Sequence, residues 1–234
     1  IKVDSDKSIS IRSFLIASIS QNVSIAQNIL ESEDVFSTIS CLKKLGVQIK
    51  KNGPKSYIIS GKGLGSLFAK KNLKLNFGNS GTLARLLIGI LSTTPFVEIK
   101  VQGDKSLNKR NMKKLIKLMS EFGAEFFPKK KFNFPLKLIS TEMPIGINYN
   151  AGISAQLKSA VILAGLNSYG TTKILEEKES RNHTENMLIK NPQVIKLKKS
   201  KKKLIEIFGK KYLKPINIRV PGDPSSAAFF AALT

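Results

Sequence analysis

The sequence has little cysteine, histidine or aromatic content, and these shortages exclude several classes of protein. It contains one cysteine, one histidine and no tryptophan, and aromatic residues make up 7% of its 234 residues. A single cysteine excludes a disulfide framework and fits a reducing compartment. No apolar run is long enough to span a membrane, and no signal-peptide pattern is present. With 41% hydrophobic residues, the chain can still bury a sizeable core.

Acidic residues are also scarce, with 16 against 39 lysines and arginines, which gives a formal net charge of +23. Such an excess normally points to nucleic acid or another polyanion. Most of the cations are lysines spread over predicted helix and turn surfaces, so we interpret the excess as a compositional bias. The run from Lys198 to Lys203 is interpreted as a solvated turn between two strands. Arginine is more informative, because its rigid fork matches oxyanions. The arginines are Arg12, Arg85, Arg110, Arg181 and Arg219.

Four serines stand at the starts of apolar helical segments, and their spacing indicates an internal repeat. They are Ser8, Ser80, Ser154 and Ser225, separated by 80−8 = 72, 154−80 = 74 and 225−154 = 71 residues. A near-constant spacing of this kind is typical of a repeated supersecondary unit. Helix starts also carry free backbone N–H groups and a partial positive charge, so several of them at one end would attract phosphate or carboxylate groups.

Within each repeat the hydrophobic pattern predicts the order β-α-β-α-β-β. Helices are expected at 7–20, 32–45, 80–92, 106–122, 154–167 and 181–189. Strands are expected at 23–26, 47–51, 56–60, 73–77, 97–101, 124–128, 136–139, 145–149, 171–175, 193–197 and 204–207. A strand at 216–220 and a helix from Asp223 are interpreted as a fourth, truncated unit. The first helix of each unit is apolar nearly all round, which is typical of a buried helix. We therefore expect an α/β (α+β) fold of buried helices surrounded by short sheets.

Seven short motifs, taken in order, point to one family. They are DKSISIR at 6–12, LESED at 30–34, GNSGT at 78–82, GDKSLNKR at 103–110, SAQLKSA at 154–160, RNHTE at 181–185 and PGDPSSAA at 221–228. One motif alone is weak evidence, but the ordered set covers the whole chain. It resembles 5-enolpyruvylshikimate-3-phosphate (EPSP) synthase, also called 3-phosphoshikimate 1-carboxyvinyltransferase. The motifs at 154–160 and 181–185 are similar to those of the second class of that family.

The resemblance implies an enolpyruvyl transferase-like fold. In that family two similar domains, each of three units, close over the substrates. Residues 6–217 would form one substrate-binding domain, with repeats at about 6–72, 73–143 and 144–215. Residues 1–5 and 218–234 would belong to the hinge and to the start of the second domain. The chain begins without methionine and ends inside a helical pattern, so we expect a fragment truncated at both ends.

The implied reaction moves the enolpyruvyl group of phosphoenolpyruvate to the 5-hydroxyl of shikimate 3-phosphate and releases phosphate. It belongs to the shikimate pathway of aromatic amino-acid biosynthesis and needs no metal and no organic cofactor. The resemblance further implies a cytoplasmic monomer with no membrane partner and no specific nucleic-acid partner. The family's principal acid/base carboxylate and lysine would lie in the missing C-terminal half, so this chain alone is expected to be inactive.

Carried over motif by motif, the resemblance assigns roles to individual residues. Lys7 would contact both substrates and take part in catalysis, with Asp34 and Asn79 as helpers at the reacting centre. Shikimate 3-phosphate would be held by Lys7, Ser8, Arg12, Ser154, Ala155, Gln156 and Arg181. Phosphoenolpyruvate would be held by Lys7, Gly81, Arg110 and Gln156.

Other conspicuous residues have ordinary structural interpretations. We expect His183 to make a structural hydrogen bond rather than to act as a general base. Arg85 and Arg219 are interpreted as an internal ion pair and a hinge contact. Cys41 falls in a predicted helix, where a packed structural thiol is expected.

The chain departs from the family's pattern at three places. Ser5 stands where the family has glycine, and Asn111 stands where it has proline, which should loosen that turn. Residues 188–193 lack the family's Phe-Gly-Val ending, which predicts a shortened helix.

In addition, glyphosate-tolerant members of the second class typically have alanine at the position of Gly81. Because this chain keeps glycine, we expect the complete enzyme to be sensitive to glyphosate.

Three other interpretations compete with this one. A UDP-N-acetylglucosamine enolpyruvyl transferase would have asparagine after the first lysine, where this chain has Ser8, and a reactive cysteine in a mobile loop. An RNA 3′-phosphate cyclase would need a nucleophilic histidine late in the chain. A non-catalytic nucleic-acid-binding module would need clustered cations interleaved with aromatic residues. Aromatic residues are scarce here, and the motifs fall at helix starts instead.

Overall fold

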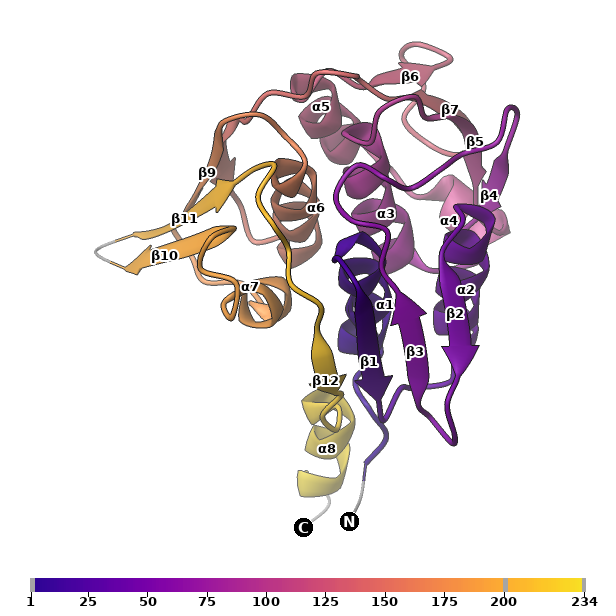
Figure 1. Ribbon diagram of the computed structural model, residues 1–234, viewed down its shortest axis with the longest axis vertical. Helices are drawn as coiled ribbons and strands as arrows, with labels where there is room; N and C mark the ends of the chain where they lie inside the picture. Colours follow the sequence, from indigo (N-terminus) through magenta and orange to yellow (C-terminus); the bar gives the residue numbers. More distant parts are fainter. Residues whose placement is uncertain (1–2, 200–201, 233–234) are drawn as a thin grey trace.

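The computed structural model describes residues 3–199 and 202–232. Three four-stranded sheets surround a core of apolar helices, as Figure 1 shows. The predicted α/β fold of buried helices within short sheets is therefore confirmed. In the described part of the chain, no helix is both long enough and apolar enough to cross a membrane.

Each third of the chain builds most of one sheet and one core helix. The first forms α1 (Lys7–Ile19), β1 (Val23–Gln27), α2 (Glu33–Lys44), β2 (Gln48–Lys51) and β3 (Tyr57–Ser60). The second forms β4 (Lys74–Asn76), α3 (Gly81–Ser92), β5 (Glu98–Gln102), α4 (Lys105–Lys109), α5 (Lys113–Glu121), β6 (Glu125–Phe127) and β7 (Leu136–Ile139). The third forms β8 (Asn148–Ala151), α6 (Ala155–Leu166), β9 (Thr171–Glu176), α7 (His183–Leu188), β10 (Ile195–Lys199) and β11 (Lys203–Phe208). The chain closes with β12 (Asn217–Arg219) and α8 (Pro224–Ala231).

The second and third sheets share one topology, and the first sheet reaches it in a different way. The strand orders are β4-β5-β7-β6 and β8-β9-β11-β10, and in both sheets the first two strands are parallel. The first sheet has the order β12-β1-β3-β2, and its β12 and β1 are parallel. The strand predicted at 216–220 therefore does not open a fourth unit. It takes the position of the opening strand that the first third of the chain lacks.

The core consists of α1, α3 and α6, which lie between the sheets in Figure 1. α3 packs against both α6 and α1, and most residues of the three helices are buried. One close approach falls at Gly89 of α3, where an added Cβ would lie 2.6 Å from the carbonyl oxygen of Ala160 in α6. Because a side chain there would push the helices apart, glycine permits this packing.

The capping residues of the core helices define the repeat more accurately than the serines do. Asp6, Ser80 and Ser154 each accept a hydrogen bond from the main-chain N–H three residues later, at 2.7, 3.2 and 3.4 Å. These caps are separated by 80−6 = 74 and 154−80 = 74 residues. The equivalence of Ser8 with Ser80 was therefore wrong, because in α1 a carboxylate caps the helix in place of a hydroxyl.

The helix predicted at 106–122 is two helices, α4 and α5. The chain is extended at Arg110, with φ −71° and ψ 137°. The side-chain oxygen of Asn111 then accepts the N–H of Lys113 at 2.8 Å, at the start of α5. This local hydrogen bond of Asn111 lies directly before α5, which begins at Lys113.

Several smaller expectations can also be compared with the structure. α7 is short, as the sequence after it predicted. β8 begins later than predicted, and Ile145 forms only an isolated bridge to Tyr169. Cys41 is buried, and its thiol donates to the carbonyl oxygen of Asn76 at 3.3 Å. Burial raises the pKa of Cys41 to about 12, so the predicted structural thiol is confirmed. Of the basic run at 198–203, residues 200–201 lie outside the described part.

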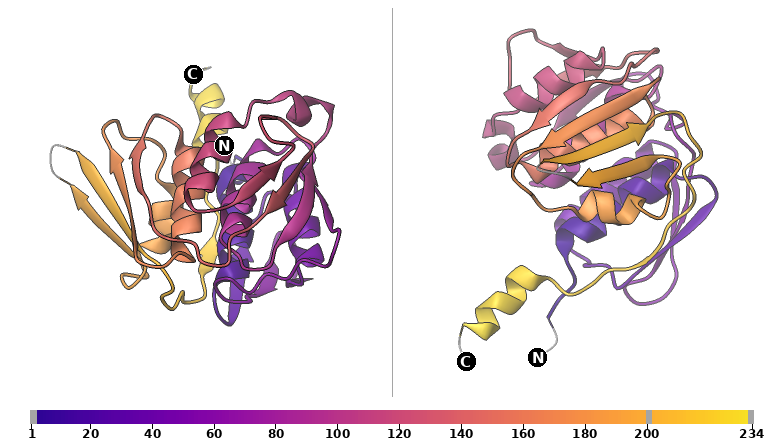
Figure 2. Two further views of the ribbon diagram at one scale, coloured as in Figure 1. Left: turned by 90° about the horizontal axis from the view of Figure 1, so that it is seen from above. Right: turned by 90° about the vertical axis from the view of Figure 1, so that its left-hand side faces the viewer.

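The beginning and the end of the chain leave the sheets side by side. The N–H of Asp6 donates to the carbonyl oxygen of Pro221 at 2.9 Å, and the N–H of Asp223 donates to that of Asp4 at 2.8 Å. Ser5 is buried between them in a bridge to Gly222. α8 then extends away from the sheets and buries none of its residues, as the right-hand view of Figure 2 shows.

Candidate active site

The first turns of the three core helices lie next to one another. Gln156 of α6 donates from Nε2 to Oγ1 of Thr82 in α3 at 2.9 Å. Arg12 of α1 donates from Nη2 to Oγ of Ser159 in α6 at 3.2 Å. Both contacts join residues of the first or second turn, so the positive ends of three helix dipoles meet in one region. Ser154 and Ala155 lie at the start of α6 in the same region, and both are half-buried.

Lys7 and Asp34 form an ion pair between the first turns of α1 and α2. Their Nζ and Oδ2 atoms are 3.1 Å apart, and the side chains are 52% and 19% exposed. A cation is unfavourable at a helix start, whereas a carboxylate is favourable there. Asp34 therefore offsets the charge of Lys7 at this position. The structure thus brings together two residues expected at the reacting centre, and the ammonium remains accessible.

Arg12 is buried, yet no carboxylate contacts it in the described part of the chain. Its Nε donates to Oγ1 of Thr184 at 2.9 Å, and its Nη1 donates to the carbonyl oxygen of Ser8 at 3.0 Å. Burial, only partly opposed by the charges of Asp6 and Glu185, lowers the pKa of Arg12 to about 10. The guanidinium stays charged at neutral pH and is held by neutral oxygens, so no contacting carboxylate neutralises its charge.

A buried ion cluster fixes α7, the helix whose Thr184 contacts Arg12. The sequence analysis did not predict this cluster. Lys158 of α6 places Nζ 2.7 Å from Oε1 of Glu176 and 2.7 Å from Oε1 of Glu185 in α7, and all three side chains are fully buried. Burial alone would raise the pKa of Glu176, but hydrogen bonds from Lys158 and Ser180 outweigh it, and the pKa is lowered. The cluster lies next to the Arg12 contacts, because Ser159 and Thr184 are the chain neighbours of Lys158 and Glu185. The motifs at 154–160 and 181–185 are thus joined in space.

Gly81 lies between two guanidinium groups at the start of α3. An added Cβ would be 2.7 Å from Nη1 of Arg85 and 2.8 Å from Nη1 of Arg110. Arg110 donates to Oδ1 of Asn79 at 2.8 Å, and Arg85 donates to the carbonyl oxygen of Gly81 at 3.0 Å. Burial and then the charge of Arg110 lower the pKa of Arg85. Two cations beside the positive end of a helix dipole are suited to hold an anion.

Arg85 was expected in an internal ion pair, and this expectation is wrong for the described residues, none of whose carboxylates pairs with it. A signal was present in the sequence. Arg85 follows Gly81 by four residues, as Arg12 follows Ser8, and both arginines donate to the carbonyl oxygen four residues earlier.

Arg181 and His183 lie where α7 begins. Arg181 is exposed, and its positive charge acts on both Arg12 and His183. His183 is half-buried, and its pKa is lowered by burial and then by the charge of Arg12. The hydrogen bond expected for His183 is not found among the described residues. The sequence analysis thus singled out His183, but it did not predict what surrounds the imidazole.

The arrangement of the sheets and core helices matches a known fold. The chain matches the solved structure of the enolpyruvyl transferase NikO from Streptomyces tendae with a TM-score of 0.73. The match covers 98% of this chain and 53% of that one, at 11% sequence identity. At this identity the match shows the fold alone, which is that of the enolpyruvyl transferases.

The sequence identifies the family within this class. The model of the EPSP synthase (3-phosphoshikimate 1-carboxyvinyltransferase) family matches residues 1–234. The chain belongs to this family. It is 42% identical over 232 residues to the 3-phosphoshikimate 1-carboxyvinyltransferase of Oceanobacillus iheyensis and 38% identical over 232 residues to that of Parvibaculum lavamentivorans. The solved EPSP synthase from Acinetobacter baumannii matches with a TM-score of 0.88 at 36% identity.

The chain spans about half the length of these relatives. It is covered to 98% in each match, but it covers 52% of the Oceanobacillus protein, 51% of the Parvibaculum protein and 51% of the Acinetobacter structure. The comparisons favour neither the UDP-N-acetylglucosamine enolpyruvyl transferase nor the nucleic-acid-binding module.

Proposed function

We propose that this chain forms the part of an EPSP synthase that binds shikimate 3-phosphate and one side of phosphoenolpyruvate. The observation that carries the proposal is the presence of two cationic groups at adjacent helix starts. One group consists of Arg12 and Arg181, and the other consists of Arg85 and Arg110. Neither group forms an ion pair with a carboxylate of the described residues. Both substrates carry a phosphate and a carboxylate, so the reaction requires several such cations in one place.

The shikimate 3-phosphate site would lie between α1, α6 and α7. Its proposed ligands are the residues with N–H or O–H donors at these helix starts, namely Lys7, Ser8, Arg12, Ser154, Ala155, Gln156 and Arg181. Arg12 supports this proposal best, because Thr184 and Ser159 hold its guanidinium in one orientation. A preorganised fork of this kind binds a carboxylate or phosphate at little further entropic cost.

Phosphoenolpyruvate would bind at the start of α3, next to Lys7. Its proposed ligands are Lys7, Gly81, Arg110 and Gln156, and the geometry adds Arg85. In the reaction, the 5-hydroxyl loses its proton and adds to C2 of the enol, while C3 takes up a proton. Phosphate then leaves C2 as C3 gives up a proton, which restores the double bond. We infer that Lys7 stabilises the charge on the transferred group, that Asp34 holds Lys7, and that Asn79 holds Arg110. The principal acid and base would come from the other half of the enzyme.

The domain assignment belongs to the same proposal. Residues 6–217 would be the substrate-binding domain, and it would extend to Arg219, because β12 completes its first sheet. Residues 1–5 and 220–234 would be the hinge and the start of a second domain. The paired chain ends beside α8 and the exposed surface of that helix support this assignment. That the protein is a monomer in the cytoplasm stays a prediction.

Calorimetric titration of the purified chain with shikimate 3-phosphate tests the proposal. We expect weak binding, and no phosphate release when phosphoenolpyruvate is added. Arg181→Gln should weaken binding ten-fold or more, since a lost charge-assisted contact costs about 1.5–3 kcal/mol. Lys178→Gln, which removes an exposed cation three residues earlier, should have little effect.

Equal effects of the two substitutions would place the site elsewhere. Phosphate release that depends on both substrates would contradict the expected inactivity of the chain alone. Strong DNA binding that weakens steeply with salt, without binding of shikimate 3-phosphate, would favour a nucleic-acid-binding module instead.

A further inference from the structure

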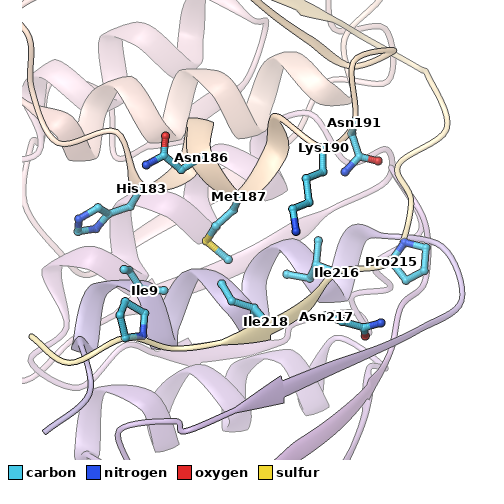
Figure 3. Close-up of a pocket in the computed structure, with 11 residues that line it drawn as sticks. Ile9, His183, Asn186, Met187, Lys190, Asn191, Pro215, Ile216, Asn217 and Ile218 are labelled. Carbon is cyan, nitrogen blue, oxygen red and sulfur yellow. The ribbon is translucent and has the colours of Figure 1, made fainter.

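A separate cavity of about 270 Å³ lies between α7, the start of α1 and the segment that contains β12. Figure 3 shows its lining, with α7 on one side and Ile216 to Ile218 on the other. None of the residues assigned to the two substrates lines this cavity. It therefore requires an explanation of its own.

The middle of the cavity is apolar. Met187 of α7 faces Ile218 of β12, with Ile9 and Ile216 beside them, as Figure 3 shows. Ile216 is buried, whereas the other three are partly exposed. An apolar surface of this kind favours an apolar ligand, because its burial removes that surface from water.

Two of the polar groups in the lining are already occupied. Oδ1 of Asn191 accepts the main-chain N–H of Lys214 at 3.0 Å. Oδ1 of Asn217 accepts the main-chain N–H of Ile25 at 3.1 Å. These two amides therefore hold the walls of the cavity together.

Lys190 and His183 are available. Lys190 forms no ion pair or hydrogen bond within the described residues, and its side chain extends into the cavity over Ile216 in Figure 3. His183 lies at the opposite end and also has no hydrogen-bond partner among those residues. The lining contains no acidic side chain. The cavity therefore offers one free cation, an apolar middle and an imidazole, which together suit a ligand with a single negative charge.

We propose that this cavity binds a small organic acid with one carboxylate and an apolar body about the size of one aromatic ring. The carboxylate pairs with Lys190, and the ring lies between Met187 and Ile218. The size follows from the volume, since a cavity of about 150 Å³ holds benzene and this one is larger. Because α7 also carries Thr184, which holds Arg12, the site lies next to the proposed substrate site but uses a different set of residues.

Titration of the ¹⁵N-labelled chain with 3-phenylpropanoate, followed by NMR, tests this proposal. We expect shifts at the amides of 186–191 and 216–218, with a dissociation constant in the millimolar range for so small a ligand. Lys190→Gln should weaken binding about three- to five-fold, because an exposed ion pair contributes little more. The neutral 3-phenylpropanamide should bind the unchanged protein more weakly than the acid by the same factor. This comparison removes the charge of the ligand and needs no protein variant. Lys196→Gln, another exposed lysine of the same third of the chain, is the matched control.

Three results would overturn the proposal. The first is equal binding of the acid and the amide. The second is an absence of shifts at 186–191 while the spectrum remains that of a folded protein. The third is displacement of the acid by shikimate 3-phosphate together with loss of binding in Arg181→Gln, because the acid would then occupy the proposed substrate site. If shikimate 3-phosphate fails to bind but the acid still shifts these amides, only the proposed function fails.

Discussion

Replacing Gly81 by alanine adds one methyl group at the point where two guanidinium groups meet the start of α3. The new Cβ would lie 2.7 Å from Nη1 of Arg85 and 2.8 Å from Nη1 of Arg110. Real Cβ contacts are longer than this, so both groups must move. They are the far ends of flexible side chains, so the stability of the fold should change little. The effect should instead appear in ligand binding.

The expected loss of affinity follows from the free-energy cost of the added methyl group. A methyl group forced into a filled site costs about 1–3 kcal/mol, and each 1.4 kcal/mol is about ten-fold in affinity. We expect glyphosate, the longer molecule, to bind about ten-fold or more weakly to the variant of the complete enzyme. Phosphoenolpyruvate is shorter and should lose less. It should still lose some affinity, because Arg110 must move away from Asn79, to which it donates at 2.8 Å.

The assay measures the glyphosate Ki and the phosphoenolpyruvate KM for the unchanged enzyme and for Gly81→Ala. Their ratio should rise in the variant. Gly152→Ala is the matched control: it lies two residues before Ser154, and an added Cβ there meets nothing within 4 Å. An unchanged ratio in Gly81→Ala, or an equal rise in the control, would refute the steric argument.

Two further predictions concern single side chains. In the complete enzyme, Arg110→Ala should raise the KM for phosphoenolpyruvate, because the loss of a charge-assisted contact costs about 1.5–3 kcal/mol of binding free energy. Lys113→Ala should not raise this KM. Equal effects of the two substitutions would mean that the site is misplaced. Lys158→Met should lower the free energy of unfolding by about 3–5 kcal/mol, measured by urea denaturation, because it leaves the buried carboxylates of Glu176 and Glu185 with only the longer ion-pair contacts to Lys203, at 3.5 and 3.6 Å. Since the pKa of Glu176 is lowered on folding, the stabilisation by this cluster is present above the unfolded pKa of that group and is lost as the pH falls through the folded value. A loss no larger than that of Lys199→Met, an exposed pair with Glu179, would contradict this account.

Features that depend on neighbours along the chain could be predicted from the sequence. Apolar periodicity and capping residues located the core helices to within a residue or two, because helix burial and caps are local properties. The spacing of the helix starts predicted the repeat, and the ordered motifs predicted which helix starts carry the candidate ligands. Even here, matching serine with serine hid the true repeat, in which Asp6 is the equivalent of Ser80.

Contacts between distant parts of the chain became visible only in the three-dimensional structure. Arg12 and Thr184 are 172 residues apart, and no local pattern marks them as partners. The same holds for the pairing of β12 with β1, for the Lys158 cluster, and for the two guanidinium groups beside Gly81. A strand carries no mark of which sheet it joins, since its hydrogen-bonding groups suit any partner. Its partner depends on the tertiary packing, which here places β12 beside the free edge of β1.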